Sequence, residues 1–99
     1  MMFGLRKKKS VGDVIESIIK KADLPSIVKN ELHSALLGVN FELEKEDRKE
    51  LDRLVKGYDT SKDSLIQILD MFILAKRKQE EDVSRLVSVV QRLRGLGAM

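Results

Sequence analysis

The sequence predicts a mainly α-helical protein that contains one short β-strand. Over most of the 99 residues, apolar side chains recur at steps of three and four, which places them on one face of a helix. Between two such regions, residues 39–44 read VNFELE and alternate apolar with polar side chains, which is the period of a strand. The alternative is that this segment begins a further helix with Asn40 as its N-cap, which predicts an all-α helical bundle.

Two amphipathic helices are expected in residues 1–38, after a basic segment that reads RKKK. Ser10 is a suitable N-cap for the first helix, and Pro25 is tolerated in the first turn of the second, which ends at Gly38. The apolar stripe of the first helix contains Val11, Val14, Ile15, Ile18, Ile19 and Ala22. The stripe of the second contains Leu24, Val28, Leu32, Ala35 and Leu36.

Helical periodicity returns after the alternating segment. A short helix is predicted at about residues 46–56, and Gly57 interrupts it. Residues 61–94 then keep a helical spacing without any Gly or Pro, so they form either one long helix or two helices that divide near residues 77–82. The apolar stripe from Val83 to Leu93 can pack on the chain's own core or on another helix.

Residues 39–73 resemble a ribbon-helix-helix DNA-binding domain. They share with that family an alternating strand that ends in a leucine, Leu43, and a Leu-x-x-Leu stripe at Leu51 and Leu54. A Leu-Ile pair at Leu65 also follows the start of the second helix. The resemblance implies that strands from two chains pair as an antiparallel ribbon in the DNA major groove, above a helical dimer core. It divides the chain into residues 1–38, a core at 39–74 and a C-terminal helical extension at 75–99.

The resemblance also assigns roles to residues of this core. Alternation along the strand would direct Asn40 and Glu42 toward the bases, where Asn can read adenine and Glu can accept from cytosine. The start of the second helix, at Thr60, Ser61 and Lys62, would hold a phosphate. The implied dimer core consists of Val39, Phe41, Leu43, Leu51, Leu54, Leu65 and Leu69.

Charge is distributed unevenly along the chain. The 19 Lys and Arg and 16 Asp and Glu give a net charge of +3, but residues 39–74 carry six basic and nine acidic side chains. Because DNA affinity comes largely from neutralising phosphates, the basic ends would have to supply the contacts that the acidic middle lacks. The residues expected in this role are Arg6, Lys7, Lys8, Lys9, Lys76, Arg77 and Lys78. The first four can instead form a solubilising tail or, as the less favoured alternative, a membrane-surface anchor.

The sequence contains no pattern that indicates catalysis. It has no cysteine and a single histidine, His33, which is expected at the surface because it has no second histidine or cysteine as a metal-binding partner. It also lacks a Gly-rich phosphate loop and the motif spacing of a catalytic triad. We therefore expect no enzymatic activity, no cofactor and no small-molecule substrate. No signal peptide or membrane span is expected either, so the predicted location is cytoplasmic.

Two functions are compatible with these patterns. The first is a homodimer or higher oligomer that binds a specific site on double-stranded DNA, as a transcriptional regulator or as a partition or replication accessory factor. The second is an all-helical interaction or scaffold protein that oligomerises through residues 61–94 and binds no DNA. The conformation of residues 39–44 is the feature that separates them.

Overall fold

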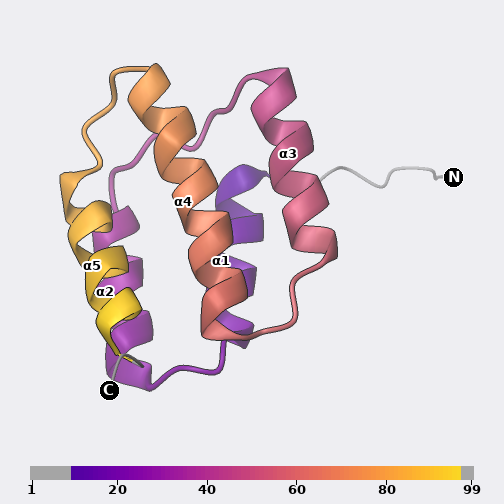
Figure 1. Ribbon diagram of the computed structural model, residues 1–99. Helices are drawn as coiled ribbons and strands as arrows, with labels where there is room; N and C mark the ends of the chain where they lie inside the picture. The colour runs from indigo at the N-terminus through magenta and orange to yellow at the C-terminus, as the bar shows by residue number, and fades with distance from the viewer. Residues whose placement is uncertain (1–9, 97–99) are drawn as a thin grey trace, which may run out of the picture.

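The computed structural model describes residues 10–96, which fold into five α-helices. These are α1 (Val11–Lys21), α2 (Ser26–Leu36), α3 (Lys45–Lys56), α4 (Lys62–Lys78) and α5 (Ser84–Gly95). Figure 1 shows α4 between α3 and α5, with α1 and α2 behind these three helices in the view. The prediction of a mainly helical protein is confirmed, and residues 39–44 form no β-strand within the described part of the chain.

Hydroxyl side chains cap two of the helices, and the cap at Ser10 is the one that the sequence predicts. Ser10 Oγ accepts a hydrogen bond from the Asp13 N–H at 3.1 Å, so it satisfies one of the free N–H groups at the start of α1. Ser61 Oγ accepts from the Ser64 N–H at 3.1 Å and caps α4 in the same way. Local sequence therefore sets where these helices begin.

Helix α4 is the centre of the core. Leu65, Leu69 and Phe72 on this helix are completely buried, and Leu51 of α3 packs in the same cluster. The three leucines were expected to need a second chain to cover them. Instead α1, α2, α3 and α5 of the same chain supply the covering side chains, so one chain forms a continuous hydrophobic core.

The long helical pattern of residues 61–94 is divided into α4 and α5. Helix α4 ends at Lys78, and Glu80 has a φ of 62°, a left-handed conformation that few non-glycine residues adopt. The Ser84 N–H then donates to Asp82 Oδ1 at 3.0 Å at the start of α5. The reversal brings Val90 and Leu93 against the core, so the C-terminal stripe packs on its own chain.

The end of α1 is fixed to the segment between α3 and α4. The Tyr58 hydroxyl donates to the Ile18 carbonyl oxygen at 2.7 Å, across 40 positions of sequence. That carbonyl would ordinarily accept from the Ala22 N–H, which bonds to Ile19 O instead. A second bond joins the same two segments, because the Asp23 N–H donates to Thr60 O at 2.9 Å.

The substitution Tyr58→Phe tests this connection. It keeps the ring in place but removes the hydroxyl, so we expect the free energy of unfolding to fall by about 1 kcal/mol, the usual net value of one hydrogen bond. For a domain of this size the melting temperature should fall by roughly 4–8 °C. Urea and thermal denaturation followed by circular dichroism measure both quantities. An unchanged stability would show that the bond contributes nothing.

Candidate functional site

Residues 39–44 form neither helix nor strand, and their side chains alternate in burial as the sequence pattern predicts. The half-buried side chains that pack against the core are Val39, Phe41 and Leu43. The exposed side chains are Asn40, Glu42 and Glu44. The Asn40 side chain is also used locally, since its Oδ1 accepts from the Glu42 N–H at 2.8 Å. The segment thus has the side-chain arrangement of a half-buried strand without a strand partner in the described chain.

A buried lysine holds this segment against α4. Lys76 is 0% exposed, and its ammonium group donates to the Glu42 carbonyl oxygen at 2.6 Å and to Gln79 Oε1 at 3.0 Å. Phe41 stacks on Phe72 with ring centroids 5.6 Å apart, and Lys76 Nζ lies 5.7 Å from the centre of the Phe72 ring. Burial lowers the pKa of Lys76, while the charges of Glu81 and Glu42 oppose this change.

The expectation that Lys76 belongs to a basic surface is therefore wrong. Lys76 begins the polar run KRKQEED at residues 76–82, and for this reason it was expected among the exposed cations. In the structure its ammonium group is buried in the core and donates to the backbone carbonyl of Glu42. Arg77 and Lys78 do lie at the surface. Lys78 Nζ is 3.0 Å from Asp47 Oδ1, so its charge is already matched by an acid of α3.

The other basic side chains of the C-terminal region are paired in a similar way. Arg92 lies 2.9 Å from a carboxylate oxygen of Glu31, and Arg94 donates to Asp70. The basic residues from Arg6 to Lys9 lie outside the described residues. They account for four of the 19 basic residues of the chain, which leaves 15 basic and 16 acidic residues after them. The folded part consequently has no excess of positive charge.

A phosphate was expected to bind at the start of α4, at Thr60, Ser61 and Lys62. This helix end already has an acidic neighbour, Asp59. Asp59 Oδ1 accepts from the Ser61 N–H at 3.0 Å. The hydrogen bonds from Ser61 lower the pKa of the Asp59 carboxyl group. A carboxylate at this helix end would repel a phosphate, which makes the end a poor anion site in this conformation.

His33 is at the surface, as expected, with Nδ1 3.1 Å from a carboxylate oxygen of Glu16. Among residues 10–96 no three His, Asp or Glu side chains are grouped closely enough to hold a metal ion. Helices of this part of the chain are also too short or too polar to cross a membrane.

The side of α4 that is not covered by other helices carries an exposed leucine. Leu74 is 63% exposed, although it lies between the buried Ile73 and Ala75. It borders a hollow of about 620 Å³ between α3 and α4, with Leu54 and Met71, and another of about 290 Å³ between α4 and α5, with Val87 and Val90. We define the α4 outer face as the residues of this helix that line the hollows and are not buried: Gln67, Asp70, Met71, Leu74, Arg77 and Lys78.

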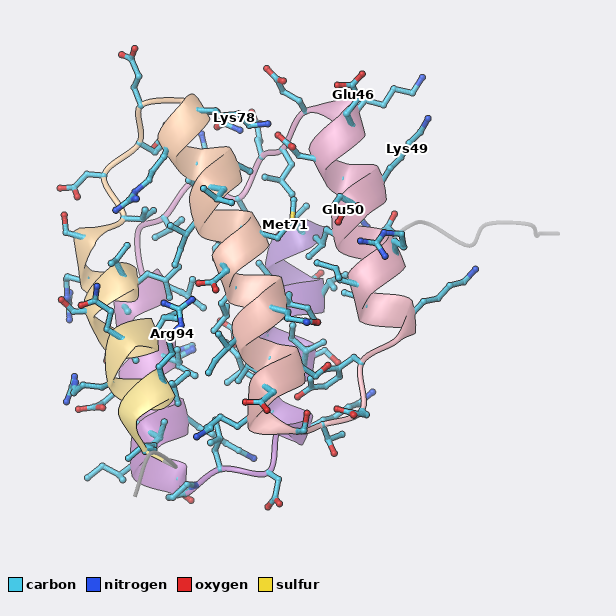
Figure 2. All side chains as sticks on the ribbon, viewed as in Figure 1. Glu46, Lys49, Glu50, Met71, Lys78 and Arg94 are labelled. Atoms are coloured by element: carbon cyan, nitrogen blue, oxygen red, sulfur yellow. The ribbon has the colours of Figure 1, made fainter. Side chains whose placement is uncertain are left out.

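Figure 2 looks onto this face. Met71 lies between α4 and α3, Lys78 is near the end of α4, and Arg94 lies between α5 and α4. Glu50 borders the hollow from α3, so the apolar centre is surrounded by charged groups of both signs. Apolar surface inside a charged border is the usual composition of a protein contact.

Sequence reasoning missed this face because residues 65–75 are almost continuously apolar. A run of this kind does not show which side of the helix is covered. A signal was available in the angular positions, since Leu74 follows Phe72 by two residues and therefore points about 200° away from it at 100° per residue. If Phe72 faces the core, Leu74 must face outward.

No known family model matches this sequence, and comparison with curated proteins and with solved structures gives no match either. The fold and surfaces of the chain itself are therefore the basis on which we infer a function.

The substitution Lys76→Met tests the attachment of residues 39–44. Methionine keeps an apolar stem but removes one of the two donors to Glu42 O, the other being Gln79 Nε2. We therefore expect the Phe41 ring to pack less closely on Phe72 and the free energy of unfolding to fall by about 1 kcal/mol. The ring current of Phe72 changes the NMR chemical shifts of the Phe41 ring. In the variant these chemical shifts should move toward the values of an exposed phenylalanine.

Arg77→Met is the matched control, because the adjacent side chain is exposed. It should leave the Phe41 signals unchanged. If Lys76→Met behaves like this control, the ammonium does not hold the segment.

Proposed function

We propose that this protein is a helical interaction module that self-associates through the α4 outer face. The observation that carries the proposal is the exposure of Leu74, 63%, at the junction of two hollows on the helix that forms the centre of the core. Full burial of an exposed leucine side chain contributes about 1.5–3 kcal/mol to the free energy of association. Met71 and Leu54 extend the apolar area beside Leu74. No catalytic role is assigned to any residue.

The charge of the fold supports contact with protein in preference to DNA. Residues 10–96 contain 15 basic and 16 acidic side chains, and many of the basic groups near α4 are already paired. Phosphate binding would have to come from elsewhere, because affinity for duplex DNA depends on unpaired cations. A mixed-charge border around apolar residues suits another protein surface.

Self-association is tested with Leu74→Asp. The wild-type protein should approach twice the 11.3 kDa mass of one chain as its concentration rises, in sedimentation equilibrium. The buried aspartate of the variant would lose its hydration at the interface, so Leu74→Asp should remain at the mass of one chain.

Leu37→Asp is the control, because Leu37 is 67% exposed and lies at the end of α2. It should associate as the wild type does. A wild-type protein that stays at 11.3 kDa at millimolar concentration, or a Leu74→Asp variant that associates normally, would contradict the proposal.

A second candidate is the ribbon-helix-helix DNA-binding function, which is favoured by residues 39–44. Asn40 and Glu42 share the exposed side of this segment. The N–H groups of Phe41 and Leu43 donate to no group among residues 10–96, so an edge is open for a strand of a second chain. In this candidate, two segments pair as a ribbon and the residues from Arg6 to Lys9 contact phosphates.

Selection from a random pool of duplex DNA at near-physiological salt tests this candidate. DNA binding through the ribbon predicts recovery of a short repeated or palindromic site, and Asn40→Ala should relax the preference at one position. Replacing Arg6 to Lys9 by glutamine should lower affinity for all sequences and reduce its salt dependence. Recovery of no preferred sequence would count against the ribbon function and leave self-association intact.

A further inference from the structure

We infer that the partner at the α4 outer face is a second copy of this chain, with the two α4 helices antiparallel about a two-fold axis beside Leu74. The inference rests on the proposed self-association and specifies its geometry. Such a contact uses the same surface on both chains, so it closes as a dimer and leaves no unfilled face for further copies.

The order of charges along α4 supports this arrangement. Asp70 lies four residues before Leu74 and Lys78 four residues after it, which places each about 6 Å from Leu74 along the helix axis. Antiparallel pairing about Leu74 therefore brings Asp70 level with the partner's Lys78, at both ends of the contact. A parallel pairing would bring like charges together instead.

Helix α3 has a second pair in the same order. Asp47 lies beside Lys78, and Arg53 lines the other end of the hollow together with Gln67. A two-fold axis perpendicular to α4 and lying in the contact plane places α3 against the partner's α3 with its ends reversed. Asp47 is then level with the partner's Arg53. The same axis places Glu50, midway between Asp47 and Arg53, level with the partner's Glu50, where each carboxylate keeps its own Arg53 as an ion-pair partner. The charges of α4 therefore decide the orientation.

The existing ion pairs do not block these contacts. Asp70 bonds to Arg94 within the chain, yet the two side chains are 38% and 52% exposed. Lys78 is 63% exposed, although it contacts Asp47, whose own side chain is only 15% exposed and is the least accessible of these acids. Carboxylates can accept several hydrogen bonds, so Asp70 can keep Arg94 as its intrachain partner while it receives Lys78 of the second copy.

Single cysteines test the register, because the natural chain contains none. Leu74→Cys lies beside the axis and should form an interchain disulfide in nearly all of the protein under mild oxidation, detected on non-reducing gels and by mass spectrometry. The controls are Leu37→Cys and Ile27→Cys, because the wild-type leucine and isoleucine are 67% and 71% exposed and line neither hollow of the α4 outer face. They should give at least tenfold less disulfide dimer.

A mixture of two variants distinguishes antiparallel from parallel pairing. Asp70→Cys and Lys78→Cys should each resist oxidation alone, since their symmetry copies would be about 12 Å apart along the axis. Mixed together, one chain of each variant should join in a disulfide-linked heterodimer. Disulfide between two Asp70→Cys chains, or none in the mixture, would overturn the antiparallel register.

The mass of the wild-type protein in solution distinguishes an error in this dimer geometry from an error in the proposed self-association. A wild-type dimer without the expected disulfides would overturn this geometry and leave the self-associating function standing. A wild-type protein that remains a single chain at all concentrations would overturn both.

Discussion

The fold depends on the burial of α4 by the other helices of its own chain. The side chains of Leu65, Leu69 and Phe72 are completely buried, and they form the centre of the cluster on which the remaining helices pack. With few aromatic residues available, the core relies on aliphatic side chains from every helix. Since α3 and α5 lie on either side of α4, its outer face is the part of this helix that residues 10–96 leave open to a partner.

The buried ammonium of Lys76 is consistent with the non-helical backbone of residues 39–44. A buried charge without hydrogen-bond partners would strongly destabilise the fold, so Lys76 requires acceptors. The Glu42 carbonyl supplies one of them, and Gln79 approaches the same oxygen from its Nε2 at 3.1 Å. In a helix this carbonyl would accept from the Glu46 N–H and be less available. The non-helical conformation is thus compatible with a single chain, without a strand partner.

Local sequence patterns predicted much of the fold, but they did not predict which side chains of α4 are buried and which form its outer face. Ser10 caps the helix that it was expected to cap, because capping depends on neighbouring residues only. The break after Lys78 was one of two open possibilities, since it uses Glu80 in a left-handed conformation and not a glycine. The burial of Lys76 and the exposure of Leu74 depend on which helices pack together. The periodicity of one helix does not predict how it packs with others.

The closed core also bears on how two chains can meet. An intertwined ribbon-helix-helix dimer shares its helical core between chains, whereas Leu51, Leu65 and Leu69 are here covered within one chain. Exchange of those contacts would first expose them to water, at about 25 cal/mol for each Å² of apolar surface. Association on the α4 outer face exposes nothing that is already buried. For this reason the outer face is the less costly route to a dimer, and any DNA contact through the basic N-terminal residues can be added without altering the core.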